Sequence, residues 1–290
     1  MEKRYDIVSI GHITRDVKVV VNEETPFVGG AAYFSSLSAA RSGAQVLVIT
    51  KVAPQDADML VELREAGIDV INLPTQKTTS MHNIFPTGDM DHRELKLVSL
   101  AEPFTLDDIP EDLDTEVFHI ASLFSGEFPQ EGILELSRRG KVALDLQAVI
   151  RSYQDGAMVY GDWPDKQTYL PCMHFIKADS QEIKIITGCD DRVQGASKLH
   201  AWGAREVVIT GQGEVLASDG TETVHSPITA KNYSGRVGRG DTCFLAYISR
   251  RLTHTIEESV RFSAALTSIK MESPGPFSGT VDDILARMTQ

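Results

Sequence analysis

Short apolar runs alternate along this chain with stretches whose apolar residues recur at helical spacing. The first run, residues 6–10, ends at Gly11, and a stretch rich in small residues, 31–41, follows Gly29 and Gly30. Short apolar runs are typical of strands buried on both faces, and their alternation with helices is the pattern of a parallel sheet. We therefore predict an α/β fold, a three-layer Rossmann-like and mostly parallel sheet with helices on both faces.

The same pattern sets the expected element boundaries. Strands are predicted at 6–10, 46–49, 69–73, 117–120, 142–145, 175–177 and 207–210, with a late hairpin at 214–218 and 222–226. Helices are predicted at 31–41, 56–66, 130–139, 180–187, 192–202, 241–252, 256–271 and 281–288. No linker of disordered composition interrupts these elements, so we expect residues 1–290 to form a single domain.

The alternation of strands and helices is interrupted between residues 78 and 101. Residues 81–85 and 94–100 have the pattern of a hairpin around Thr87-Gly88-Asp89, and residues 17–21 resemble another strand. We expect lid segments at about 12–28 and 78–101 to form a small antiparallel sheet that covers a cleft and excludes water. A surface hairpin without a role is the alternative. The exposed edges of such a lid could pair with a second copy, so a homodimer through the lid is expected.

Charge and cysteine content narrow the choice of partners. The net charge is -13, and this repels nucleic acid, although a small anion can still bind at backbone N–H groups. The three cysteines are widely spaced, as in proteins of a reducing compartment. No apolar run approaches the ~20 residues that span a bilayer, and the N-terminus lacks a signal-peptide pattern. We expect a cytoplasmic protein without nucleic-acid or membrane partners.

The stretch Gly238-Arg239-Gly240-Asp241 precedes an apolar run with helical spacing. Its glycines allow the backbone to approach a ligand closely, and the first turn of a helix can hold an anion. A carboxylate at this position can take a proton from an attacking hydroxyl, which suits phosphoryl transfer. Asp241 as an ordinary N-cap residue is the alternative.

Polar residues also follow several predicted strands. In parallel α/β sheets, ligands bind beyond the carboxyl ends of the strands. These residues are therefore expected to share one cleft. Taken alone, each is also typical of a helix cap or a solvated loop. They are Asp16, Gly29 and Gly30 near the first strand, Asp145, Gln147 and Arg151 after 142–145, Asp179 and Glu182 after 175–177, and Thr210 and Gly211 after 207–210.

Taken together, these motifs resemble the ribokinase-like (PfkB) carbohydrate kinases, over nearly the whole chain. The resemblance implies that Asp241 is the base and that the amides of Arg239, Gly240 and Asp241 form an anion hole together with Gly238. It also implies the following roles: Asp16, Gly29, Gly30 and Gln147 in acceptor binding, Asp179 with Thr210, Gly211 and Gly213 in nucleotide binding, and Glu182 at Mg²⁺. ATP is the expected donor, with its purine between the Thr210 loop and the helix around 263–273.

Three departures from the family pattern bear on specificity. Phe34 takes the place of a frequent Asn, and the run from Gly29 to Phe34 looks more like the inositol, or cyclitol, kinase branch. Gly235 stands where the family often has an Asp linked to a monovalent-cation site, so potassium activation is not expected. Arg236 and Arg239 add cationic side chains near the expected phosphates.

The sequence therefore predicts an ATP- and Mg²⁺-dependent phosphotransferase that acts on a hydroxyl of a small polyhydroxylated substrate, a sugar or a cyclitol. A nucleoside kinase and a non-catalytic sugar or nucleotide sensor on the same fold are the alternatives. A dinucleotide-dependent oxidoreductase is disfavoured, because the turn after the first strand, Gly11-His12-Ile13-Thr14-Arg15-Asp16, lacks the glycines of a pyrophosphate-binding turn.

Overall fold

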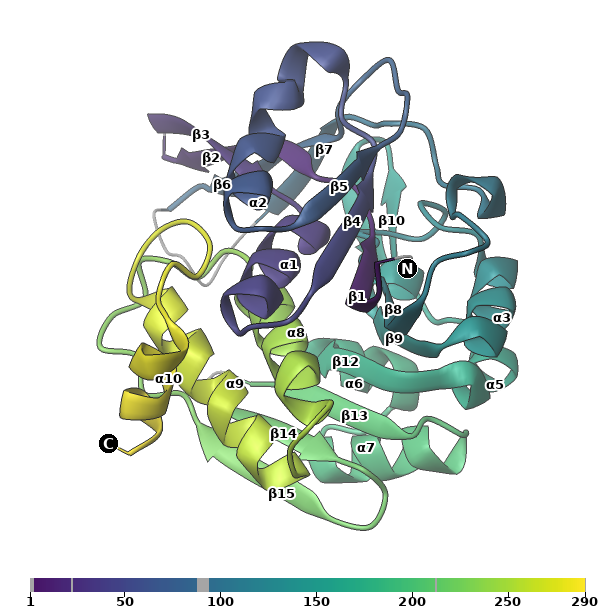
Figure 1. The fold of residues 1–290 in the computed structure, drawn as a ribbon, viewed down its shortest axis with the longest axis vertical. Coiled ribbons are helices and arrows are strands. Elements are labelled where there is room, and N and C mark those ends of the chain that lie inside the picture. The colour runs from purple at the N-terminus through teal and green to yellow at the C-terminus, as the bar shows by residue number, and fades with distance from the viewer. Residues whose placement is uncertain (1–2, 22, 88–93, 212, 290) are drawn as a thin grey trace.

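A nine-stranded sheet forms the body of the molecule (Figure 1). The computed structural model describes residues 3–21, 23–87, 94–211 and 213–289. The strand order is β15-β14-β13-β12-β9-β8-β1-β4-β5, parallel from β13 to β5, with β14 and β15 antiparallel. The strands are β1 Tyr5–Ile10, β4 Val46–Thr50, β5 Asp69–Asn72, β8 Thr115–Ile120, β9 Lys141–Asp145, β12 Met173–Asp179, β13 Glu206–Thr210, β14 Glu214–Ser218 and β15 Thr223–Pro227. The predicted mostly parallel α/β sheet is confirmed.

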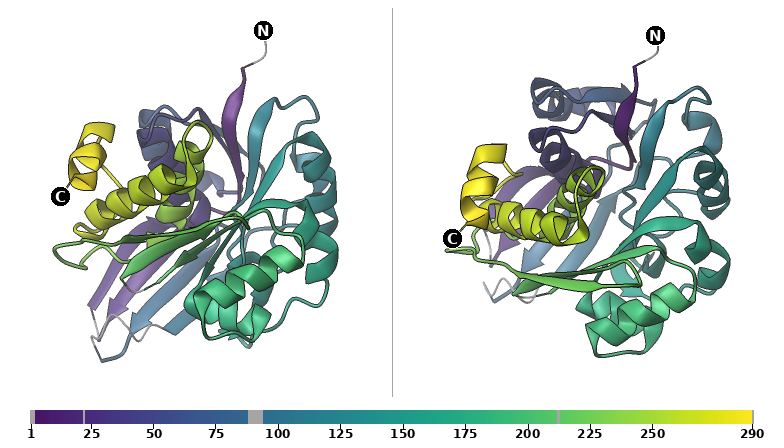
Figure 2. Two further views of the ribbon diagram at one scale, coloured as in Figure 1. Left: turned by 90° about the horizontal axis from the view of Figure 1, so that it is seen from below. Right: turned by 60° about the horizontal axis from the view of Figure 1, so that its bottom comes forward.

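Helices cover both faces of this sheet because successive strand residues point to opposite sides. Ile7 and Val48 belong to the core shared with α1 and α8, whereas Val8 and Ile49 belong to the core on the other face. In Figure 2 the yellow-green helices α8 and α9 lie on one side of the sheet and the teal helices on the other. The helices are α1 Ala31–Arg41, α2 Val61–Glu65, α3 Gln130–Arg139, α4 Gln147–Ile150, α5 Lys166–Tyr169, α6 Ser180–Thr187, α7 Arg192–Ala201, α8 Arg239–Arg251, α9 Ile256–Met271 and α10 Val281–Met288.

Two helix predictions need correction. The helix expected at 56–66 is a 3-10 helix, Pro54–Leu60, followed by the short α2. Within it, the Asp56 carboxylate accepts hydrogen bonds from Arg15 and Thr78, so this segment is shaped by tertiary contacts. Helix α8 begins two residues before the predicted start, and its N-cap residue is Gly238. Asp241 therefore lies inside the first turn and is not the N-cap.

A second sheet of six strands packs beside the body as the lid, in the order β10-β11-β7-β6-β2-β3. Its strands are β2 Thr14–Val20, β3 Glu23–Gly29, β6 Ser80–Phe85, β7 Glu94–Ser99, β10 Arg151–Gln154 and β11 Ala157–Tyr160. All pairs are antiparallel except β2–β6, which is parallel. The sequence analysis missed β3, β10 and β11, of which β3 and β10 are rich in polar residues. Of the expected turn Thr87-Gly88-Asp89, Gly88 and Asp89 lie outside the described residues. A dimer through the lid edges stays a prediction.

A buried carboxylate joins the body to the lid. Glu127 accepts the backbone N–H of His12 at 2.8 Å and that of Leu123 at 2.8 Å. Both bonds are buried, so they hold the chain where it leaves β1 for the lid and where it leaves β8. This junction sets the position of β2, which carries Asp16. Among the residues that the structure describes, no helix combines the length and apolar character needed to cross a membrane.

Candidate active site

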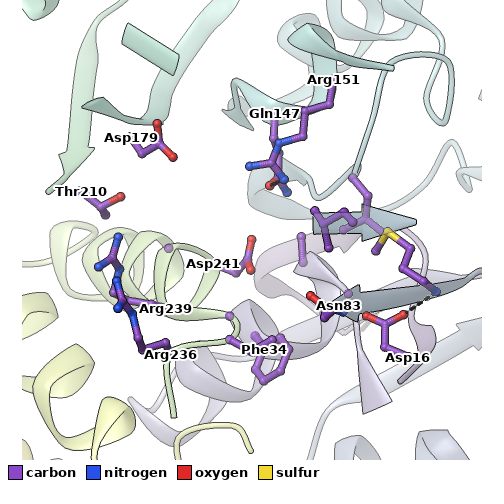
Figure 3. Close-up of a pocket in the computed structure, with 18 of the residues that line it drawn as sticks. Asp16, Phe34, Asn83, Gln147, Arg151, Asp179, Thr210, Arg236, Arg239 and Asp241 are labelled. Carbon is purple, nitrogen blue, oxygen red and sulfur yellow. Dashed lines mark hydrogen bonds between the residues drawn. The ribbon is translucent and has the colours of Figure 1, made fainter. Parts of the chain in front are cut away.

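One pocket lies between the lid and the carboxyl ends of the body strands, with a volume of about 330 Å³. Its lid end is lined by Asp16, Met81, Asn83, Phe85 and Leu95. Its cationic end is lined by Asp179, Thr210, Arg236 and Arg239. In Figure 3, Asp241 lies between Asp16 and Asn83 on one side and the residues of the cationic end on the other. The pocket therefore places one carboxylate between a mainly uncharged compartment and a compartment with two arginines.

The loop before α8 has a conformation that requires glycine. Gly238 is left-handed, with φ 74°, and a Cβ there would lie 2.3 Å from the ring of Phe34. A side chain at position 238 would therefore be strained and would displace the ring. Phe34 and Gly238 together set the angle at which the chain enters α8.

The first turn of α8 offers free backbone donors to the pocket. The amide of Arg239 donates to the carbonyl oxygen of Arg236 at 3.2 Å, and that of Thr242 donates to Gly238 at 2.9 Å. Within the described chain, no backbone carbonyl accepts the amides of Gly240 and Asp241. The expected anion hole of three amides is thus reduced to two, because the Arg239 amide is already used. Two free amides at a helix N-terminus still favour an anion.

Asp16 is held at the lid end by the lid itself. It is 3% exposed, and its Oδ1 accepts the backbone N–H of Met81 at 3.0 Å. Gly29 lies on β3 opposite Thr14, where a Cβ would come 2.6 Å from Asp16 Oδ2. Gly29 therefore makes room for the carboxylate and does not itself line the pocket, whereas Gly30 does.

Beneath the loop lies a buried network of two acids and two bases. Lys177 Nζ donates to Asp145 Oδ2 at 2.7 Å, and Arg151 donates to Glu182 Oε1 at 2.9 Å. Burial disfavours the Lys177 ammonium, but the charges of Asp145, Glu182 and Asp241 raise its pKa well above its usual range. Burial also opposes ionisation of Glu182, yet Lys177 and Arg151 hold its pKa below the usual value. A Cβ at Gly240 would lie 3.0 Å from Lys177 Nζ, so this ammonium lies directly under the anion-binding turn.

The expected role of Glu182 as a magnesium ligand does not fit this geometry. Glu182 is 1% exposed, and its Oε2 accepts the amide of Asp179 at 2.8 Å while Oε1 is bound by Arg151. Asp179, by contrast, lines the pocket. Magnesium usually keeps several waters and takes only one or two carboxylates, so Asp179 fits as a ligand of a donor-bound ion. The described residues include no cluster of three or more His, Cys, Asp or Glu that would hold a metal by themselves.

The remaining sequence-predicted residues divide into two groups. Gln147 lines the pocket, with its Oε1 bound by Arg151 at 2.6 Å and its Nε2 donating to Ser122 at 3.2 Å. Gly211 and Gly213 do not line it, and instead border a separate surface hollow next to Glu214.

Part of the helix surface expected for a purine is covered by protein. On α9, Ser263, Thr267 and Ser268 are each 0% exposed. The segment before α8 packs against the end of this helix, where the amide of Lys231 donates to Glu272 at 2.9 Å. The side chains of Ser263, Thr267 and Ser268 are therefore not open to a base.

Several residues that line the pocket were not predicted from the sequence. Met81, Asn83, Phe85, Leu95 and Leu123 line the pocket from the lid and from the loop after β8. Their strand alternation was visible, but which face meets the body depends on how the lid packs. Lys177 could have been found from the sequence, because a lysine inside a buried apolar strand rarely lacks a partner and so indicates a buried ion pair.

Comparisons with known proteins identify the family of the chain. The family model for pfkB family carbohydrate kinases matches residues 4–282. A solved structure described as a pyrophosphate-dependent kinase in the ribokinase family, complexed with a pyrophosphate analog and myo-inositol, is 32% identical, with 97% of this chain and 99% of that chain covered and a TM-score of 0.89.

Two further relatives differ in substrate. A pyrophosphate-dependent myo-inositol-1 kinase, converted into a myo-inositol-3 kinase by two substitutions to leucine, is 31% identical over 98% of both chains, with a TM-score of 0.88. A cytidine kinase of Thermococcus kodakarensis is 28% identical over 95% of this chain and 99% of its own length. The chain belongs to the pfkB family of carbohydrate kinases, phosphotransferases that act on sugars, cyclitols or nucleosides.

Proposed function

We propose that this protein transfers a phosphoryl group from inorganic pyrophosphate to a hydroxyl of a cyclitol such as myo-inositol, with Asp241 as the general base. The position of Asp241 carries the proposal, because it lies between the lid end and the cationic end of one pocket (Figure 3). An acceptor bound at the lid end and a phosphate bound at the cationic end would meet at this carboxylate.

The reaction follows from groups on either side of Asp241. The carboxylate orients the acceptor hydroxyl and takes its proton as the oxygen–phosphorus bond forms. The bond from the same phosphorus to the departing phosphate breaks in line. The amides of Gly240 and Asp241, at the positive end of α8, stabilise the charge on the transferred group. Magnesium, when bound to the donor, would neutralise part of the phosphate charge, and Asp179 is the residue that would hold it.

Three observations support pyrophosphate as the donor. Arg236 and Arg239 line the cationic end, where a compact, highly charged ligand needs cations. Among the described residues, the pocket lining takes in Thr210 but neither Gly211, Gly213 nor any residue of α9. The relatives above 30% identity include kinases that use pyrophosphate. ATP with Mg²⁺ is the second candidate, supported by the resemblance of 179–182 and 210–213 to the family's nucleotide motifs.

The lid end supports a cyclitol as the acceptor. Asp16 and Asn83 are both 3% exposed and line the pocket, so two polar side chains border a space in which a ligand would be closed off from water. The myo-inositol-bound relative supports this choice. A nucleoside is the alternative acceptor, supported by the cytidine kinase and by the apolar surface of Phe34, Phe85 and Leu95, which suits a base.

A crossed donor and acceptor screen tests the proposal. The purified chain is incubated with pyrophosphate or with ATP, each with Mg²⁺, and with myo-inositol, ribose or cytidine, and products are followed by phosphorus NMR. We expect the pair of pyrophosphate and myo-inositol to react fastest. Turnover of cytidine with ATP would establish the alternative instead. Binding without turnover in every pair would indicate the non-catalytic sensor.

A further inference from the structure

Lys270 is a buried lysine near the end of α9 that is used by none of the steps above. It is 2% exposed, and its ammonium donates hydrogen bonds to the carbonyl oxygens of Gly235 and Val237. These two carbonyls belong to the segment that leads into Gly238 and the first turn of α8. The ammonium therefore connects α9 to the segment that presents the anion-binding amides.

The segment that Lys270 holds is seated directly on the end of α9. The amide of Gly235 donates to the carbonyl oxygen of Met271 at 2.9 Å. A Cβ at position 235 would lie 1.8 Å from the carbonyl oxygen of Ser273, so no side chain fits there. A carboxylate at 235, which the family often uses near a monovalent cation, is sterically excluded in this chain. The monovalent-cation site that the family often has therefore does not fit these residues, in agreement with the expectation from the sequence.

The surroundings of the ammonium are those of a bound cation. Lys270 Nζ lies 5.2 Å from the centre of the Phe34 ring, the same ring that packs against Gly238. Two buried carbonyl oxygens that face one point need a shared donor or cation, because leaving them unpaired is costly. Burial lowers the pKa of Lys270 to about 8, while the charge of Asp241 favours the ammonium and that of Arg239 opposes it.

We propose that Lys270 is a positioning residue that acts as a tethered cation: its ammonium holds residues 235–238 so that the amides of Gly240 and Asp241 and the Asp241 carboxylate keep their places without a free monovalent cation. This inference rests on the proposed function, because the value of the positioning is measured on phosphoryl transfer. Lys270 thereby joins the residues that support phosphoryl transfer although it lies outside the pocket lining. With the ammonium in place, activity does not depend on potassium.

Two substitutions of Lys270 separate the charge from the space that it fills. Lys270→Ala removes the ammonium and leaves a cavity, whereas Lys270→Met fills the same space without charge. We expect turnover to fall roughly 10- to 100-fold in both, as for loss of charged hydrogen bonds. Potassium, ammonium or methylammonium ions should restore several-fold activity to Lys270→Ala and little to Lys270→Met. Wild-type turnover should be equal in sodium, potassium and tetramethylammonium salts.

Lys51 supplies the matched control. It is 6% exposed, and its Nζ donates to the carbonyl oxygen of Pro103 at 2.9 Å, away from the loop before α8. Lys51→Ala should lose stability like any variant that loses a buried lysine, but it should gain no response to monovalent cations. A cation response in Lys51→Ala equal to that of Lys270→Ala would overturn the proposal.

Amide hydrogen exchange gives a readout that does not depend on activity. Peptides covering residues 235–242 should exchange faster in Lys270→Ala than in the wild type and should be protected again by potassium. If the wild type transfers phosphate in no donor and acceptor pair while this exchange pattern holds, the proposed function fails and the positioning role stands. Normal turnover in Lys270→Ala, a folded Lys270→Ala whose activity is restored by none of the three cations, or potassium activation of the wild type overturns the inference. Wild-type turnover in sodium, potassium and tetramethylammonium salts tests the inference even if the variants do not fold.

Discussion

The two ends of the pocket are built in different ways. The cationic end comes largely from one continuous stretch, residues 236–241, whose amides and arginines are set by a left-handed glycine and a helix start. The lid end is assembled from separate strands, with Asp16 on β2, Asn83 on β6 and Leu95 on β7. A local motif can present phosphate-binding groups, whereas the shape of the acceptor compartment depends on how distant strands pair. Substitutions at the cationic end should therefore affect binding of the phosphate donor, and substitutions at the lid end should affect binding of the acceptor.

The largest effect is expected where the two ends meet, at Asp241. Asp241→Asn keeps the shape of the side chain but removes the proton acceptor, so turnover should fall by roughly 10²–10⁴-fold. The affinities for donor and acceptor should stay close to those of the wild type. Because Asp241 is not the N-cap of α8, the loss in stability should be limited to a dipole interaction of about 0.3–1 kcal/mol. Near-normal turnover in a folded variant contradicts the mechanism.

A second substitution isolates the cationic end. Arg239→Gln removes one charge beside the anion-binding turn, and kcat/KM for the donor should fall roughly 10- to 100-fold. The KM for the acceptor should hardly change, and steady-state kinetics with each substrate varied in turn measure both. Arg138→Gln, on the exposed face of α3, is the matched control for loss of a positive charge. An equal rise in both KM values would show that the two ends are not separate.

Asp16 provides the opposite test at the lid end. Asp16→Asn can still accept the Met81 amide but binds a hydroxyl less strongly, at a cost of about 1–1.5 kcal/mol. Acceptor affinity measured by calorimetry should therefore fall roughly tenfold, as expected for that energy. Donor affinity should remain at the wild-type value. Unchanged acceptor affinity would remove Asp16 from the acceptor site.

The contrast between the two ends also explains what the sequence predicted well. The parallel body and the stretch at 238–241 were recognisable because apolar periodicity and glycine spacing are local patterns. Each of the helices 31–41, 130–139 and 180–187 has the predicted bounds. The buried faces of these elements are specified by their own residues, so no long-range contact had to be known.

The less accurate predictions concern residues whose role is set by distant partners. Glu182 was expected at a metal because residues 179–182 resemble a family motif after a strand end, but Arg151 and the Asp179 amide take both of its oxygens. The strand β3 was missed because its exposed half carries glutamates and a proline, and it forms only by pairing with β2. Lys270 appeared as an ordinary residue of a helix. Its partners lie 33 and 35 residues away in the sequence, at Val237 and Gly235.

The smallest effect on rate, and the finest test of the lid end, is expected at Asn83. On β6, Met81, Asn83 and Phe85 alternate toward the body, and Asn83 is the polar residue among them. Leu95 lies directly opposite Asn83 on β7 and lines the same pocket, so an amide and an aliphatic side chain border the proposed acceptor end side by side.

A cyclitol ring has several similar hydroxyls, and the one that faces Asp241 depends on which others are hydrogen-bonded. Asn83→Leu removes such a partner while keeping a similar volume, so total turnover should change by less than about tenfold. The ratio of phosphorylated regioisomers should shift, because the ring can turn when one hydrogen bond is lost. Phosphorus and proton NMR of the products measure that ratio directly. Leu95→Asn is the reciprocal variant and should shift the ratio through a new hydrogen bond. If both variants keep the wild-type product ratio, the lid strands exclude water from the pocket but do not select the reacting hydroxyl.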